Sequence, residues 1–125
     1  MTSATFSMTI RWSLPFGESR PLVSTLQGLM VPNRSRPGCM ACILNVGTGT
    51  QQVVITYVEE WKTEGDLKRQ LHSHEFGVLA ELMERASAQP AIEFSLAGST
   101  RGLDYAREVC GCADRKVYPT RQDEG

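Results

Sequence analysis

The sequence predicts a single α+β domain in which an antiparallel sheet carries its helices on one side. Three observations predict this class. Four segments have the apolar pattern of a strand, and helical patterns stand after the first strand and before the last. The second and third strands follow each other directly across a glycine-bearing turn. The expected order is β-α-β-β-α-α-β, in a chain of 125 residues that suits one domain.

The first strand and first helix are predicted from two apolar periods. Residues 7–14 alternate polar and apolar side chains, which is typical of a half-buried strand. Its apolar face holds Met8, Ile10, Trp12 and Leu14. Ser19 is the predicted N-cap of the helix that follows, and apolar residues then recur at helical spacing. Pro32 is expected to end this helix because proline lacks the N–H that a helix interior needs.

A β-hairpin is predicted after the polar loop at residues 32–38. Its strands are residues 39–46 and 52–61, and a glycine-bearing turn joins them. The second of these strands is apolar on both faces, with Val53, Ile55, Tyr57 and Trp61 on one and Val54, Thr56 and Val58 on the other. Because an exposed apolar sheet face usually marks an interface, we expect a further surface to cover the second face.

Two helices and a strand complete the predicted domain. Thr63, with Asp66 three residues later, is expected to cap a short helix that ends near Leu71. The next helix has an apolar face made of Phe76, Leu79, Ala80, Met83 and Ala86. Pro90 ends this region, and residues 91–97 alternate as a fourth strand.

The element order is that of a ferredoxin-like split βαβ arrangement. We expect a flexible N-terminus at residues 1–6, the domain at 7–109 and a polar tail at 110–125. Residues 101–109 could form one further short helix within the domain.

Composition excludes several classes of function. Thirteen Lys and Arg residues are interleaved with fourteen acids, so we expect no nucleic-acid partner. No apolar run approaches the length that spans a bilayer, and the first residues lack a secretory pattern, so we expect a cytoplasmic protein without a membrane partner.

The four cysteines form a CxxC and a CxC pair, a spacing that also occurs in zinc sites. Cys39 and Cys42 lie in a predicted strand, where residues three apart point to opposite faces, and Cys110 and Cys112 lie in the polar tail. We therefore expect thiols and no metal site.

Several fragments together resemble one family. These are RPGCMACILNV, the strand end YVEEW, the segment TEGDLKRQLHSHEFGVLAELME and the closing IEFSLAGSTRGLDY. Over roughly residues 7–105 the chain resembles the antibiotic-biosynthesis monooxygenases. The resemblance implies ferredoxin-like subunits whose sheets pack into a homodimeric α+β barrel. It also implies one of several activities: cofactor-free oxygenation of quinols or polycyclic phenols, haem degradation, or isomerisation of a signal molecule.

Two departures from the family pattern narrow these activities. Trp61 matches a tryptophan of the aromatic-polyketide oxygenases, but Tyr57 stands where those enzymes have an asparagine. The haem-degrading members have an axial histidine and a tryptophan where this chain has Ala80 and Gln70. Because haem iron needs a side-chain ligand, we do not expect haem degradation, and we expect no cofactor.

The predicted catalytic residues are His72, His74, Tyr57 and Trp61. A histidine can act as a base at neutral pH, and His72 is the first choice; alternatively, one histidine caps a helix end and the other is solvated. Tyr57 could donate a hydrogen bond to a ligand or lie at the dimer contact. Trp61 could stack on a planar substrate or close the core.

The predicted substrate-binding residues are Arg11, Phe76, Leu79, Met83 and Cys42. Arg11 could steady an anionic oxygen or pair with Glu59 or Glu93 across strands. The three apolar residues are expected to line both the core and a pocket wall.

These observations predict a homodimeric, cofactor-independent monooxygenase that acts on a quinol-like or polyphenolic small molecule. Two alternatives stay open. One is a non-catalytic dimeric module that binds a small aromatic or hydrophobic ligand. The other is an isomerase of a small oxygenated metabolite.

Overall fold

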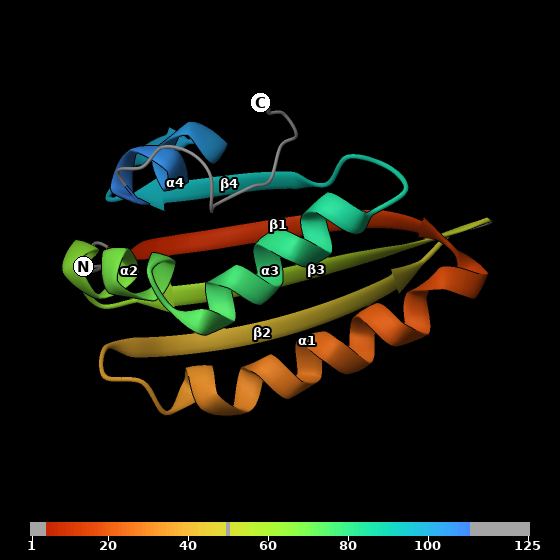
Figure 1. Ribbon diagram of the computed structural model, residues 1–125, viewed down its shortest axis with the longest axis horizontal. Helices are drawn as coiled ribbons and strands as arrows, with labels where there is room; N and C mark the ends of the chain where they lie inside the picture. The colour runs from red at the N-terminus through yellow and green to blue at the C-terminus, as the bar shows by residue number, and fades with distance from the viewer. Residues whose placement is uncertain (1–4, 50, 111–125) are drawn as a thin grey trace.

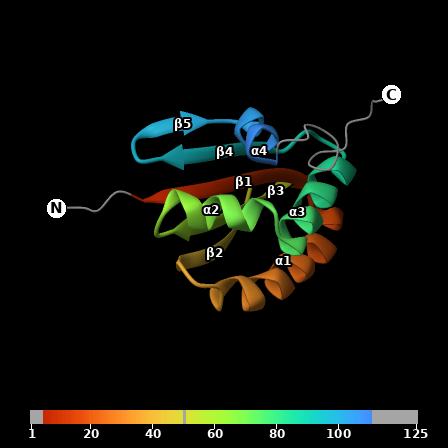
Figure 2. The same cartoon turned by 60° about the vertical axis from the view of Figure 1, so that its left-hand side comes forward.

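A computed structural model describes residues 5–49 and 51–110 of the chain. The elements are β1 (Phe6–Pro15), a 3₁₀ turn (Phe16–Glu18), α1 (Ser19–Arg34), β2 (Cys39–Thr48), β3 (Gln52–Trp61), α2 (Glu64–Leu71), α3 (His74–Arg85), β4 (Ala91–Leu96), β5 (Ser99–Arg101) and α4 (Leu103–Cys110). The sheet is antiparallel throughout, in the order β2-β3-β1-β4-β5 (Figures 1 and 2). The predicted α+β, ferredoxin-like fold is confirmed.

The helices lie on one side of the sheet, as two views of the ribbon show (Figures 1 and 2). The alternation predicted for the first strand places its apolar residues on this inner face, where they pair with β3 as Met8↔Glu59, Ile10↔Tyr57 and Trp12↔Ile55. The core therefore forms between the inner face of the sheet and the helices.

The ends of α1 differ from the prediction. Ser19 does not cap the helix with its side chain, because a 3₁₀ turn precedes it and its hydroxyl donates to Phe16 O at 3.2 Å. Pro32 does not end the helix either, which continues to Arg34. The side chain of Asn33 is fully buried and hydrogen-bonded in the core, and these contacts hold the last turn in helical form beyond the proline.

The predicted start of α2 agrees with the structure, and α3 begins with a cap of the same kind that was not predicted. Thr63 accepts a hydrogen bond from the backbone N–H of Asp66 at 3.1 Å, as a capping residue does. Ser73 accepts one from the N–H of Phe76 at the same distance, so α3 begins two residues before its first core residue. The two caps fix how α2 and α3 follow each other over the sheet.

The start of β2 contains a bulge that the sequence pattern did not indicate. The pairing with β3 shifts between Cys39 and Ala41, so that Cys39 lies opposite Trp61 and Cys42 opposite Glu59. Both cysteines therefore lie on the inner side of the sheet, and the prediction that they point to opposite faces is wrong. A bulge adds one residue to the strand and restores the same face after three positions.

The loop before β2 needs a glycine. Gly38 has a φ of +87°, and a Cβ there would lie 2.1 Å from a carboxylate oxygen of Asp66. Its carbonyl accepts a hydrogen bond from Lys62 N at 2.8 Å. The loop thus runs directly against the start of α2, which holds the end of β3 in place.

The C-terminal part adds one short strand, β5, to the predicted elements. β5 pairs with β4 across Ala97 and Gly98, and the sequence pattern did not predict it. The predicted short helix is present as α4 and ends at Cys110, whereas residues 111–125 of the predicted tail lie outside the described residues.

The outer face of the sheet has no helix over it in the described part of the chain (Figure 2). At its centre lie Thr9, Ile43, Thr56 and Val58, with Val54 nearer one end; we call these residues the open face. Ile43 and Val54 are exposed. Within residues 5–49 and 51–110, no helix is both long enough and apolar enough to cross a membrane.

Candidate functional site

A fully buried acidic residue lies on the inner face of the sheet. Glu59 has none of its surface exposed, and it lies between Tyr57 and Trp61 along β3. An ionised carboxylate is costly to bury unless hydrogen bonds replace its water. The side chains around Glu59 are therefore candidates for a functional site.

Four side chains donate hydrogen bonds to this carboxylate. Tyr57 Oη donates to Oε2 at 2.6 Å, and Trp61 Nε1 donates to Oε1 at 3.1 Å. Asn33 Nδ2 and Gln70 Nε2 both donate to Oε2, at 3.1 and 3.3 Å. We call Asn33, Tyr57, Glu59, Trp61 and Gln70 the Glu59 cluster.

Three elements bring the cluster together. The two-residue period of β3 places residues 57, 59 and 61 on the same face. Asn33 comes from the last turn of α1 and also donates to Tyr57 Oη at 2.8 Å, while Gln70 from α2 donates to Asn33 Oδ1 at 3.0 Å. The amides therefore join both helices to the same carboxylate.

The surroundings of Glu59 affect its acidity in two opposing ways. Burial raises the pKa of Glu59, and the hydrogen bonds from Tyr57, Trp61 and Gln70 and the charge of Arg36 act against that rise. Burial, with the nearby carboxylate, also raises the pKa of Tyr57, which keeps its hydroxyl protonated as a donor. A carboxylate with a raised pKa is a stronger base near neutral pH than an ordinary one.

A small cavity adjoins the cluster. It measures about 20 Å³ and is lined by Arg36, Pro37, Trp61, Asp66, Arg69 and Gln70. Two buried polar atoms on these side chains, Arg36 Nε and Gln70 Oε1, have no hydrogen-bond partner among the described residues. The space suits a single water molecule or another molecule of that size.

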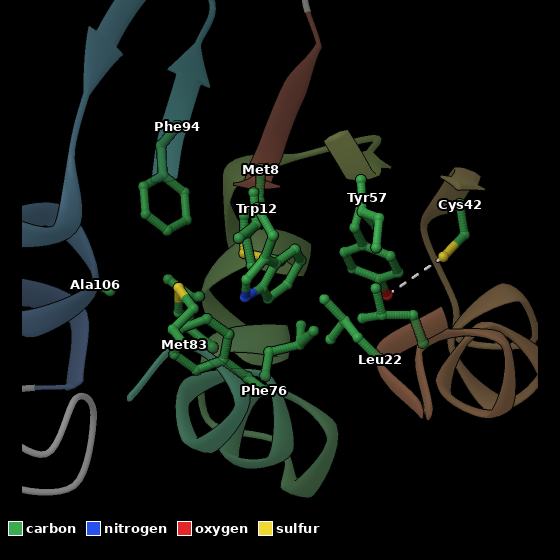
Figure 3. Packing of buried hydrophobic residues seen from close by; sticks show 14 of the residues in the cluster. Met8, Trp12, Leu22, Cys42, Tyr57, Phe76, Met83, Phe94 and Ala106 are labelled. Carbon is green, nitrogen blue, oxygen red and sulfur yellow. Dashed lines mark hydrogen bonds between the residues drawn. The ribbon is translucent and has the colours of Figure 1, made fainter. Parts of the chain in front are cut away.

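Three of the predicted site residues meet at this cluster. Tyr57 and Trp61 both donate hydrogen bonds to the carboxylate. Cys42 Sγ lies 3.4 Å from Tyr57 Oη (Figure 3). Burial raises the pKa of Cys42 to about 11, so it is a thiol at neutral pH and a weak nucleophile.

The three apolar residues predicted as pocket wall lie in the core. Phe76, Leu79 and Met83 are buried on α3, and Figure 3 shows Phe76 and Met83 beside Trp12. They pack between α3 and the sheet, which agrees with the expected part of their role in the core.

The two histidines lie at helix ends, outside the Glu59 cluster. His72 is the C-cap of α2 and His74 is the first residue of α3, and both are exposed. Neither takes part in the hydrogen bonds of the carboxylate described above. Their catalytic role stays a prediction.

Arg11 lies on the outer side of the sheet and is exposed. The predicted pairing of Arg11 with Glu59 is wrong, because the register places Arg11 opposite Thr56 while Glu59 points to the inner face. Within the described residues no ion pair joins Arg11 to Glu93.

Sequence reasoning missed Asn33, Glu59 and Gln70 as site residues. The signal for Glu59 was present, since an acid two residues from each of two inward-facing aromatics must share their face. Gln70 likewise stands between Leu67 and Leu71 on the buried side of α2. Asn33 gave no such signal, because it follows a proline.

Comparisons with known proteins identify the fold. No family model matches the chain, and no curated protein matches it in sequence. A protein from Shewanella oneidensis superposes with a TM-score of 0.64 at 16% identity, covering 75% of this chain and 91% of that one. These similarities show the fold alone.

Two further solved structures carry descriptions of activity. A Bacteroides thetaiotaomicron protein described as a possible oxidoreductase has a TM-score of 0.61 at 12% identity, covering 76% of this chain and 99% of its own. A Bacillus cereus protein described as a candidate antibiotic biosynthesis monooxygenase has a TM-score of 0.55 at 15% identity, covering 80% of this chain and 99% of its own.

Proposed function

We propose that the protein is a cofactor-independent monooxygenase of a small quinol-like or polyphenolic molecule, related to the antibiotic-biosynthesis monooxygenases, with Glu59 as its base. The observation that supports this most is a buried carboxylate between two aromatic side chains, in a fold that occurs in a candidate monooxygenase. The sequence resemblance over roughly residues 7–105 points in the same direction.

The proposed reaction begins with a proton transfer. Glu59 takes a proton from an activated C–H or O–H group of the substrate, and the electron-rich anion that remains transfers electrons to dioxygen. A C–O bond forms and the O–O bond breaks. A CH₂ group and O₂ thereby give a C=O group and H₂O, and no other reductant is needed.

The protein contributes a base and donors to this reaction. Removal from water makes the Glu59 carboxylate more reactive, and protonation relieves the cost of burying its charge. Tyr57 donates its one hydroxyl proton to Glu59, and once Glu59 is protonated this proton can be donated to a developing oxyanion instead. The cavity beside Gln70 is too small for such a substrate, so Arg36 and Arg69 would have to leave their ion pairs with Glu75 and Asp66 to open a path to Glu59.

Oxygen uptake tests this proposal. Metal-stripped protein is mixed with a panel of quinols, naphthols and anthrones in an oxygen electrode. We expect uptake with at least one compound, and we expect Glu59→Gln to lower kcat by about 100-fold, the usual scale for loss of a general base. Glu60→Gln is the matched control, because Glu60 neighbours Glu59 but points to the other face.

A result in which His72 and not Glu59 is essential would contradict the assignment of the base. If His72→Ala abolishes uptake while Glu59→Gln retains it, the base is His72 and the assignment of Glu59 is wrong. Product formed equally well without oxygen would mean an isomerase.

A non-catalytic binding module is the second candidate function. Both carboxylate oxygens of Glu59 accept hydrogen bonds from side chains, and the adjoining cavity holds about one water molecule. This arrangement also suits a cluster that only stabilises the fold, as a module without catalytic activity would have. Absence of uptake across the whole panel would favour this function.

We further propose that two copies of the chain pair through the open face. Its apolar residues have no covering element in the described part of the chain, and such a face is costly to leave in water.

Light scattering at micromolar concentration should then give the mass of a dimer, where one chain has a mass of 13.8 kDa. Val58→Lys should give a monomer because it buries a charge in the centre of the contact. Val46→Lys, which adds the same charge at an exposed position on the other side of the sheet, should stay dimeric. A monomeric wild-type protein would contradict the proposal.

A further inference from the structure

The two oxygens of the Glu59 carboxylate have unequal surroundings. Oε2 accepts hydrogen bonds from Tyr57 Oη, Asn33 Nδ2 and Gln70 Nε2. Within the described residues, Oε1 accepts only one side-chain hydrogen bond, from Trp61 Nε1. An ionised carboxylate offers about four acceptor sites, two on each oxygen. The three donors therefore occupy Oε2 fully, and Oε1 keeps one acceptor site open.

The donors to Oε2 cannot be exchanged for acceptors, because the hydrogen bonds of the Glu59 cluster run in one direction around a closed ring. An ionised carboxylate only accepts, so the atom of Gln70 that contacts it is the amide nitrogen. This nitrogen also donates to Asn33 Oδ1, which leaves Asn33 Nδ2 to donate to Tyr57 Oη. Tyr57 then directs its one proton to Glu59. Turning either amide over would place two donors or two acceptors against each other.

This asymmetry determines which oxygen of Glu59 can hold a proton at the lower cost. A proton on Oε2 would occupy one of its acceptor sites and leave at least one of three donors without an acceptor. Asn33, Tyr57 and Gln70 are all buried, and a buried donor without an acceptor is costly. A proton on Oε1 uses the open site, and Trp61 keeps its hydrogen bond.

We propose that Oε1 is the atom of Glu59 that takes up the proton, and that Asn33 and Gln70 are positioning residues that occupy Oε2. This proposal rests on the proposed function, in which Glu59 is the base. The C–H or O–H bond of the substrate breaks, its electron pair stays on the substrate, and the proton joins the free lone pair of Oε1. Neither amide touches the substrate, so both act through the carboxylate alone.

Infrared spectroscopy of the protonated carboxyl tests the proposal without a substrate. The difference between spectra of the acidified and the neutral protein contains the C=O stretching band of Glu59, which Glu59→Gln removes. Because burial raises the pKa of Glu59, this band should appear at a higher pH than the bands of exposed carboxyls. The wavenumber of the band falls when the carbonyl oxygen accepts hydrogen bonds. Removing one donor at a time therefore shows which oxygen is the carbonyl and which holds the proton.

Variants on the two sides of the carboxylate should behave differently. Asn33→Leu and Gln70→Met each remove one donor to Oε2 and replace it with an apolar side chain of similar length. We expect both to move the Glu59 band to higher wavenumber. Trp61→Phe removes the donor to Oε1 and should move the band much less, because Oε1 carries the proton. Circular dichroism checks that each variant is folded, and either amide variant decides the test if the other does not fold.

Cys42→Ala is the matched control for these variants. The Cys42 thiol lies 3.4 Å from Tyr57 Oη and is not among the donors to the carboxylate (Figure 3). Its removal changes the packing beside the Glu59 cluster and leaves every donor to Glu59 in place. We expect its band at the wild-type wavenumber.

Kinetics provide a second measurement once a compound of the oxygen-uptake panel is oxidised. Asn33 does not line the cavity beside Gln70, so Asn33→Leu should leave KM unchanged. It should lower kcat by about 10-fold, less than the loss of the base itself, because Oε2 then competes for the proton.

Four outcomes would overturn the proposal. The first is a larger shift in Trp61→Phe than in the amide variants, which would place the proton on Oε2. The second is a wild-type band in both amide variants, and the third is an equal shift in Cys42→Ala. The fourth is a wild-type kcat in Asn33→Leu when Glu59→Gln is inactive. The infrared outcomes do not depend on turnover, so a failure of the proposed function, seen as an absence of oxygen uptake, is distinguished from a failure of this proposal.

Discussion

Replacing Glu59 with leucine is expected to lower the free energy of unfolding by about 3–5 kcal/mol, because several buried donors lose their acceptor at once. The apolar side chain would leave Tyr57, Trp61, Asn33 and Gln70 without the acceptor that they share. Each buried donor that loses its partner costs about 1–3 kcal/mol, although neighbours recover part of this through their own contacts. Equilibrium unfolding in urea measures the change.

The matched control is Glu60→Leu, on the opposite face of the same strand, which should change stability by less than about 0.5 kcal/mol, as surface substitutions usually do. An equal loss in both variants would mean that the Glu59 cluster does not stabilise the fold.

Glu59→Gln separates the shape of this side chain from its charge. Burial raises the pKa of folded Glu59, so the folded protein binds this proton more tightly than the unfolded chain does. The stability of the wild type should therefore fall, relative to the variant, as the pH rises from the unfolded pKa through the folded one. Each unit of difference between the two pKa values corresponds to about 1.4 kcal/mol. Parallel profiles across this pH range would show that the pKa is not raised.

Phe94→Ala is expected to destabilise the domain by about 3–5 kcal/mol, because it removes a large ring from a site with no exposed surface. Phe94 packs against Tyr105 with 5.1 Å between ring centroids, and Tyr105 Oη donates to Glu64 Oε2 at 2.7 Å. The substitution should therefore also increase hydrogen exchange in α4, which Tyr105 attaches to β4 and α2.

Phe16→Ala is the control for this prediction, since Phe16 is 49% exposed and its loss should change stability little. If α4 exchanged no faster in Phe94→Ala than in Phe16→Ala, the ring contact would not be what holds the helix.

The fold could be predicted from the sequence because its signals are local. The alternation in β1 and the Thr63 cap of α2 depend on neighbouring residues alone. The bulge at the start of β2 was not predictable in this way, since it changes which face a residue occupies without changing the apolar composition. The short strand β5 has only three residues, too few to show a period.

The candidate site was harder to predict because its residues are distant in the chain. Strand periodicity placed Tyr57 and Trp61 on one face, and the family resemblance made them site candidates. Asn33 reaches Tyr57 across 24 residues, and Gln70 bonds Asn33 across 37. A polar side chain after Pro32 reads as part of a loop, and only the packed structure shows that α1 continues through it. Long-range hydrogen bonds leave no periodic trace in the sequence.

The buried carboxylate also decides which alignment of β3 the chain can tolerate. A shift of β3 by one residue would exchange its faces, so that Val58 and Glu60 would point inward in place of Glu59. The amides of Asn33 and Gln70 would then face Val58, or Glu60 at a different position along the strand. They would lose the acceptor that they share in Glu59. Since both faces of β3 carry valines, hydrophobicity alone discriminates weakly between these alignments. The Glu59 cluster therefore makes the observed register of β3 more stable than a register shifted by one residue, which the apolar residues alone would not do.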